Sequence, residues 1–134
     1  MKVTFGCHKL TRDKTEERFI QRNINGEFRH IAGDELIQAL KKKLHEEVDE
    51  IMESKDTHEL MTEIADVLDV LDALRTAYAI SDQTLNAYRA TLHQTRGTFE
   101  TGLYLDTFTI ESDNPQYETY ISRPHKYPVL KTEN

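Results

Sequence analysis

Residues 44–66 read LHEEVDEIMESKDTHELMTEIAD and hold the strongest structural signal in the chain. On both sides of Lys55-Asp56, apolar residues recur every three or four positions, the spacing of one face of an α-helix. Lys55-Asp56 is typical of a turn, and Thr57 is a candidate N-cap for the helix that follows. Because the connection is short, we expect two antiparallel helices packed as a hairpin.

The same periodicity continues in both directions along the chain. It predicts helices over about residues 34–54, 57–79 and 81–96. Asp34 and Ser81 are the candidate N-caps of the first and third helices, and Gly97 is well placed to end the third. The expected fold class is therefore all-α, a helical bundle.

Two segments outside the helices carry weaker signals. The amino arm, residues 1–33, predicts a brief helix at 15–21 and a short strand at 27–32 between two turns. The carboxyl tail, residues 106–134, is rich in aromatic and β-branched residues and is expected to be extended. We therefore expect one domain over residues 1–105 with short β additions at the amino end and in the tail. The tail should pack on that domain or on a partner subunit.

Composition narrows the possible functions and locations. The chain has 134 residues, of which 37% are hydrophobic, and a formal net charge of -7, which argues against binding to nucleic-acid backbones. No apolar run is long enough for a secretion signal or a membrane span. A single cysteine, Cys7, excludes an intrachain disulfide. We expect a cytoplasmic protein with neither nucleic-acid nor membrane partners.

Two pairs of carboxylates fall where apolar residues would be expected. At about 100° per residue, Glu47 lies inside the apolar arc of the first long helix, and Glu50 lies at its edge one turn later. Glu63 lies among the apolar residues of the second helix, with Asp66 on the border of that arc. Four acidic side chains are thus predicted to converge between two facing helices.

A single Glu-x-x-Glu on a helix is usually part of a solvated surface. Four carboxylates at a helix interface are different, because they repel one another and are costly to desolvate unless a cation lies between them. An all-oxygen ligand set favours Mg²⁺, with Mn²⁺ as a substitute, over zinc. The predicted metal ligands are Glu47, Glu50, Glu63 and Asp66.

The spacing of these acidic residues resembles a known signature. Residues 46–50, EEVDE, followed by residues 63–66, EIAD, resemble the EExxE and ExxD motifs of MazG-like, all-α nucleoside triphosphate pyrophosphohydrolases. Residues 9–14, KLTRDK, and 96–100, RGTFE, resemble segments of the phosphoribosyl-ATP-pyrophosphohydrolase-like subgroup. The resemblance covers roughly residues 9–105. It implies the all-α fold of that family and the same four metal ligands.

The implied activity is a hydrolase acting on phosphoric anhydrides. A nucleoside triphosphate would be cleaved between its α- and β-phosphates, giving a monophosphate and pyrophosphate, in the housekeeping of non-standard nucleotides. Glu46 and Glu50 are both candidates to orient the attacking water. The catalytic set is therefore Glu46, Glu47, Glu50, Glu63 and Asp66. Candidate phosphate or nucleotide contacts are Lys9, Arg12, Lys14, Arg89, Arg96 and, as a base-stacking ring, Phe99.

Two departures from the family pattern leave alternatives open. Thr15-Glu16 stands where many relatives have Ile-Pro, and the tail beyond about residue 106 is longer than in short relatives. The alternatives are a non-catalytic nucleotide-sensing or interaction module of the same fold, and a phosphoribosyl-ATP pyrophosphohydrolase.

The apolar arcs of the predicted helices are wider than the contact within one hairpin can cover, so a homodimer or homotetramer is expected.

Overall fold

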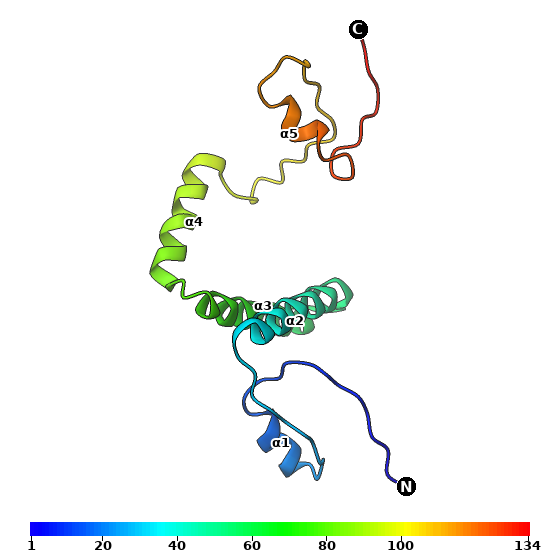
Figure 1. Ribbon diagram of the computed structural model, residues 1–134, viewed down its shortest axis with the longest axis vertical. Coiled ribbons are helices and arrows are strands. Elements are labelled where there is room, and N and C mark those ends of the chain that lie inside the picture. The colour runs from blue at the N-terminus through cyan, green and yellow to red at the C-terminus, as the bar shows by residue number, and fades with distance from the viewer. The chain divides into compact units, whose positions relative to one another are not determined.

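The computed structural model describes all residues from Met1 to Asn134 and is helical. The expected all-α class is confirmed, whereas the expected short β additions are wrong, because the chain contains no strand. It forms two compact units, Met1–Thr95 and Arg96–Asn134. The predicted extent of the domain, residues 1–105, stays a prediction. The helices, labelled in Figure 1, are α1 (Thr15–Gln21), α2 (Gly33–Glu53), α3 (Thr57–Ala77), α4 (Asp82–Arg96) and α5 (Tyr117–Ile121).

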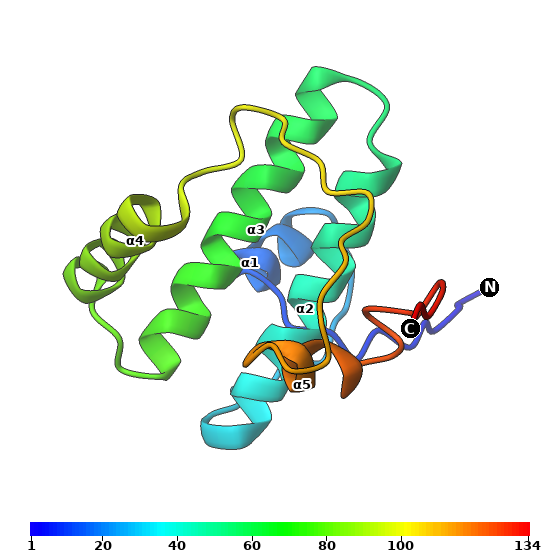
Figure 2. The same ribbon diagram turned by 90° about the horizontal axis from the view of Figure 1, so that it is seen from above.

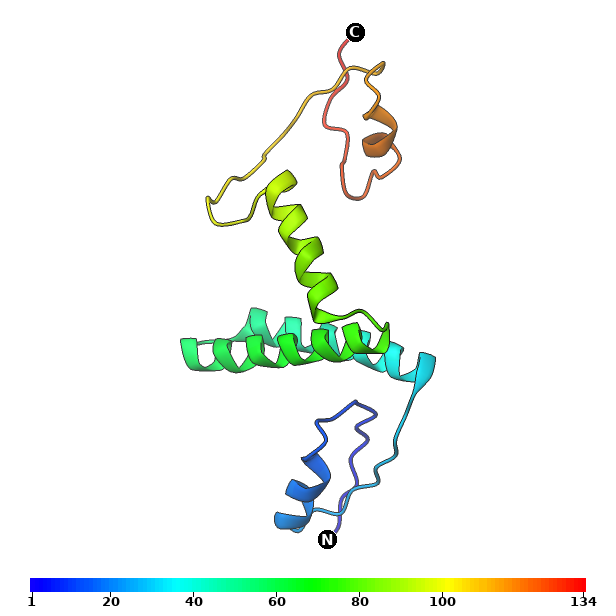
Figure 3. The ribbon, with the colours of Figure 1, turned by 90° about the vertical axis from the view of Figure 1, so that its left-hand side faces the viewer.

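The hairpin of α2 and α3 is the centre of the first unit. The two helices lie side by side in Figures 2 and 3, and they are the one pair of helices in extensive contact. Leu40 of α2 is 2% exposed and is the only buried apolar residue. The predicted bounds of these helices differ from the observed ones by no more than two residues.

The connection between α2 and α3 is fixed by side-chain hydrogen bonds. The Ser54 hydroxyl donates to the carbonyl of Ile51 at 2.8 Å, which closes the end of α2. Asp56, not Thr57 as predicted, is the N-cap of α3, and its carboxylate accepts from the Glu59 amide at 2.8 Å. Glu59 in turn accepts from the Lys55 amide at 2.8 Å, an arrangement close to a capping box. These bonds set the register of α3 against α2.

The other predicted helix ends had mixed outcomes. Asp34 is not the N-cap of α2, because the helix already begins at Gly33 and Ala32 has the extended backbone of the cap position. Ser81 does cap α4, since its hydroxyl accepts from the Thr84 amide at 3.0 Å. Gly97 adopts φ +78° just beyond α4, the left-handed conformation that ends helices.

The amino arm contains the predicted helix α1 but not the predicted strand at 27–32. A strand needs a paired backbone, and no other segment pairs with this one. Phe28 instead packs edge to face on Phe19 of α1, with ring centroids 5.5 Å apart. Gly26 makes this possible, because a Cβ there would lie 2.6 Å from the Phe28 ring.

The second unit holds a small aromatic cluster. The predicted extended segment at residues 117–121 is wrong, since it forms α5. The Asn114 carboxamide oxygen accepts from the Gln116 amide at 2.8 Å, and this local turn starts the helix. Tyr120 then packs on Phe108 and Tyr127, with centroid distances of 4.7 and 5.0 Å. No helix in either unit has both the length and the apolar character needed to cross a bilayer.

Candidate metal centre

Four carboxylates converge where α2 faces α3. One ligand oxygen from each of Glu47, Glu50, Glu63 and Asp66 lies within 4.8 Å of the other three. The helical repeat explains this, because Glu47 falls on the same line of α2 as Leu40 and so points at α3. Glu63 and Asp66, both half-buried, face back from α3. The predicted convergence of these four side chains is thus observed.

Glu47 is the most unusual of the four. It is 5% exposed and is the only buried charged residue in the chain. Its Oε2 atom is fully enclosed and has no hydrogen-bond partner, and the same is true of Oε2 of Glu63. Burying a carboxylate oxygen without a partner costs free energy, so these two atoms are the strongest indication of a cation-binding site in the chain.

The crowding of the carboxylates changes their proton affinities. Burial raises the pKa of Glu47 above its usual 4.5. The pKa of Glu63 is raised to about 7, first because its protonated form can donate to Glu50 and then because of desolvation. The metal-free site therefore retains a proton near neutral pH, which is the response expected of acidic groups that lack a counterion.

Basic side chains neutralise part of this charge from the rim. Arg12 Nη2 lies 2.6 Å from Asp66 Oδ1, and its Nη1 lies 2.8 Å from Asp69 Oδ2. Lys43 Nζ lies 3.4 Å from Glu47 Oε1 and 3.6 Å from Glu46 Oε2. These contacts leave the two buried Oε2 atoms unpaired.

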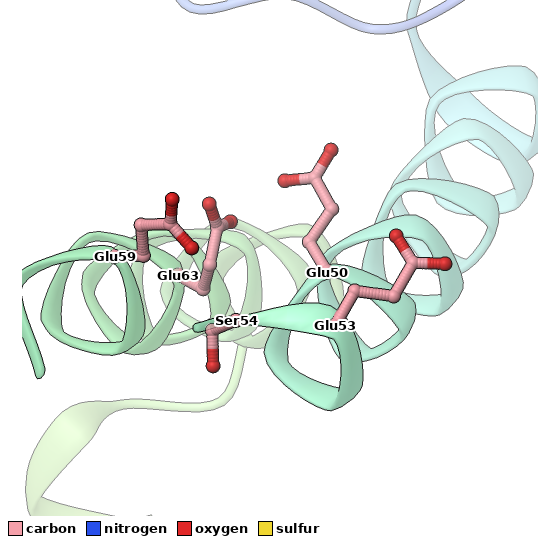
Figure 4. A pocket seen from close by; sticks show the side chains of 5 residues that line it. All are labelled: Glu50, Glu53, Ser54, Glu59 and Glu63. Carbon is pink, nitrogen blue, oxygen red and sulfur yellow. The ribbon is translucent and has the colours of Figure 1, made fainter. Parts of the chain in front are cut away.

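Two hollows adjoin the four carboxylates. The smaller, of about 190 Å³, lies by the α2–α3 connection and is acidic. Figure 4 shows the carboxylates of Glu50, Glu59 and Glu63 pointing to the same side of the helix pair, while the Ser54 side chain points away. The larger, of about 420 Å³, lies between residues 10–15 of the amino arm and the two helices. Glu47 and Asp66 line this larger hollow, so it opens onto the metal-ligand candidates.

The donor set fits a hard divalent cation. All four groups are carboxylates, they come from two facing helices, and two of their oxygens are buried without a partner. Mg²⁺ prefers oxygen ligands and commonly keeps several waters, which the exposure of Glu50 permits. Glu47, Glu50, Glu63 and Asp66 would hold such an ion.

Of the other predicted catalytic and nucleotide-binding residues, some lie near the four carboxylates and some do not. Glu46 lies beside the cluster, with Lys9 Nζ 3.8 Å from its Oε1. Arg12 lines the larger hollow, whereas Lys14 and Arg89 are exposed and line neither hollow. Arg96 and Phe99 belong to the second unit, so their assignment to the nucleotide site stays a prediction.

The sequence interpretation overlooked Lys43 and Asp69. Lys43 lies four residues before Glu47, which is the spacing of an ion pair along a helix. It also falls on the inward line that contains Leu40 and Glu47, a signal that could have identified it. Asp69 lies one turn after Asp66 and shares Arg12 with it.

Comparison of the chain with protein-family models, with curated proteins and with solved structures finds no match in any of the three. The MazG-like family therefore stays a prediction from the motifs, and the site is argued from its own geometry.

Proposed function

We propose that this chain is a Mg²⁺-dependent nucleotide pyrophosphohydrolase, in which Glu47, Glu50, Glu63 and Asp66 are the metal ligands. The observation that carries the proposal is Glu47, a carboxylate 5% exposed whose Oε2 has no partner and which faces three more carboxylates. A surface cluster of acidic residues would not bury an oxygen in this way. The all-carboxylate donor set supports a divalent cation, for which we propose Mg²⁺, with Mn²⁺ as a substitute.

The substrates we propose are nucleoside triphosphates, non-standard ones foremost, cleaved to a monophosphate and pyrophosphate. When bound, Mg²⁺ supplies neutralisation of phosphate charge and a lowered pKa for the attacking water. The larger hollow, at about 420 Å³, falls in the size range of small-molecule sites and places a ligand against Glu47 and Asp66. This hollow is where the nucleotide would bind.

The protein's own groups have distinct tasks in this reaction. Glu46 or Glu50 would orient the attacking water by accepting a hydrogen bond from it. Glu50 is exposed and pairs with no basic side chain, whereas Glu46 lies within 4 Å of both Lys9 and Lys43. Glu50 is therefore freer to accept from water. Arg12, at the rim of the hollow, would bind the phosphates through its planar fork of N–H donors.

We further propose that the protein acts as a homodimer or homotetramer. On α3 an exposed apolar face recurs at helical spacing beside the face that contacts α2, and it consists of Met61, Ile64, Leu68 and Leu71. Leu40 is the only buried apolar residue, so one copy covers little of its own apolar surface. A second copy of the hairpin offers the same apolar face, so a self-complementary contact would cover both.

The decisive test is pyrophosphate release from a panel of ordinary and modified nucleoside triphosphates, with Mg²⁺, with Mn²⁺ and with chelator. Metal-dependent pyrophosphate release that is lost in Glu47→Gln and kept in Asp49→Asn would support the proposal, because Asp49 is exposed on the same helix. Full activity of Glu47→Gln would contradict the site. Turnover of phosphoribosyl-ATP in preference to free triphosphates would identify the related reaction instead. Nucleotide binding without turnover at any metal concentration would indicate a non-catalytic module.

A further inference from the structure

The larger hollow has basic side chains on two of its walls. Arg12 reaches it from the amino arm, and Lys43 reaches it from α2, one turn before Glu47. No other lysine or arginine lines this hollow. A polyanionic ligand that entered it would therefore meet one cation from each side.

Lys43 is held in place without being tightly bonded. Its Nζ lies 3.4 Å from Glu47 Oε1 and 3.6 Å from Glu46 Oε2, both longer than a usual N–H···O hydrogen bond of about 2.9 Å. The side chain is 26% exposed and lines the larger hollow. Electrostatic attraction to these two carboxylates orients Lys43, and its ammonium has three donors, so at least one remains for another acceptor.

We propose that Lys43 is a phosphate-binding residue, which together with Arg12 binds the phosphate chain of the ligand in the larger hollow. This inference rests on the proposed function, since it requires an anionic ligand beside the metal ligands. Each of the two basic side chains forms an ion pair with one of the proposed metal-binding carboxylates, Arg12 with Asp66 and Lys43 with Glu47. A divalent ion that took over Glu47 and Asp66 would take one of its two carboxylate partners from each cation, leaving Arg12 with Asp69 and Lys43 with Glu46. The phosphates would replace the lost partner of each cation.

The competing explanation is that Lys43 only stabilises α2 through its pair with Glu47 at i and i+4. The two explanations differ in what the loss of the ammonium does. A structural role predicts that metal binding and phosphate binding weaken together. A phosphate contact predicts that phosphate binding weakens selectively, while metal binding is kept or becomes tighter because a competing cation has been removed.

The test measures two affinities by calorimetry on the full chain, first for Mn²⁺ alone and then for inorganic tripolyphosphate with excess Mg²⁺. Tripolyphosphate is used because its affinity does not depend on the nucleotide base. The variants are Lys43→Gln, the charge-conserving Lys43→Arg, and Lys42→Gln as the matched control. Lys42 is the adjacent residue, is exposed, and pairs with no carboxylate.

We expect Lys43→Gln to weaken tripolyphosphate binding about tenfold or more, the usual effect of losing a charge-assisted hydrogen bond. Mn²⁺ affinity should be unchanged or higher, Lys43→Arg should restore most of the loss, and Lys42→Gln should match the wild type. Unchanged tripolyphosphate binding in Lys43→Gln, or an equal loss of both affinities, would overturn the inference. Wild-type protein that binds Mn²⁺ but not tripolyphosphate would overturn it while leaving the metal centre intact. Failure to bind either would refute the proposed function as well.

Discussion

Glu47→Gln replaces the buried carboxylate of the candidate metal centre with a neutral amide of nearly the same shape. Glu47 Oε2 is enclosed without a hydrogen-bond partner. Glu50, Glu63 and Asp66 each place one carboxylate oxygen within 4.8 Å of an oxygen of Glu47. An amide nitrogen at that position could donate to one of these neighbours. The substitution therefore removes an unpaired buried charge and adds a donor among acceptors, so the metal-free variant should be more stable than the wild type.

The magnitude follows from two opposing contributions. An enclosed acceptor without a partner costs about 1–3 kcal/mol. Against this gain, the substitution removes the ion pair between Glu47 and Lys43. That loss costs at most about 1 kcal/mol, since the Lys43 ammonium is partly exposed. After the full loss of about 1 kcal/mol is subtracted, the net gain without metal is about 0–2 kcal/mol, or up to roughly 8 °C in Tm for a chain of this size. With Mg²⁺ at a hundred times its Kd, the wild type gains about 2.7 kcal/mol that the variant does not, so the order of stability reverses.

The assay is thermal unfolding of wild type, Glu47→Gln and Asp49→Asn in chelator and across a Mg²⁺ titration. We expect Glu47→Gln to melt highest in chelator, the wild type to overtake it as Mg²⁺ rises, and Asp49→Asn to follow the wild type. If Glu47→Gln melts below the wild type in chelator, the oxygen is already satisfied within the chain. If Mg²⁺ raises the Tm of both equally, the ion binds elsewhere. Either result would refute the reasoning about Glu47.

Three further predictions concern other parts of the first unit. Because the pKa of Glu63 is about 7 in the folded chain against an ordinary 4.5, the folded state holds a proton that the unfolded state has lost. The Tm in chelator should thus fall as pH rises from about 4.5 to 7 and then level, and Glu63→Gln should flatten that slope. Arg12→Gln should raise Mn²⁺ affinity about two- to fivefold, because Asp66 loses a competing cation, yet weaken nucleotide binding, and titration calorimetry can measure both effects. Leu68→Asp, on a residue 57% exposed, should turn a sedimenting dimer or tetramer into a monomer, and a wild-type monomer would contradict the proposed association.

Helical spacing made most of the first unit predictable. Leu40 and Glu47 lie seven residues apart, two turns of one helix, so the apolar arc that predicted α2 also placed Glu47 against α3. The short connection then fixed which residues of the two helices face each other. The convergence of the four carboxylates was predictable because the spacing of each one from the apolar residues of its own helix gives the side of the helix on which it lies.

The wrong secondary-structure predictions concern segments whose conformation depends on side chains that are distant in the sequence, which local sequence patterns do not identify. The residues at 27–32 were predicted as a strand from turn signals, but no segment pairs with them and Phe28 packs on α1 instead. Tyr120 belongs to a segment whose aromatic composition favours an extended chain. The Asn114 turn begins a helix there, and Phe108 and Tyr127 then pack on its aromatic face. Side-chain packing of this kind overrides intrinsic β-propensity.

Basic residues of the site were harder to identify than acidic ones, for a physical reason. A carboxylate on an apolar arc stands out because burying it is costly, whereas a lysine or arginine can lie along apolar surface and still keep its charge near water. Lys43 lies on the inward line of α2 and was overlooked for this reason, although its spacing from Glu47 is visible in the sequence. Arg12 was identified only through a motif in the amino arm.

A cation at the candidate metal centre would affect the stability of the hairpin as well as the chemistry of the site. Leu40 is the only buried apolar residue, so the packing of α2 on α3 rests on few enclosed contacts. Glu47 and Glu50 come from α2, and Glu63 and Asp66 come from α3, so an ion among them would link the two helices directly. Without it, repulsion among the same carboxylates acts against the hairpin. A divalent cation among these four carboxylates would thus replace a destabilising contact between α2 and α3 with a stabilising one.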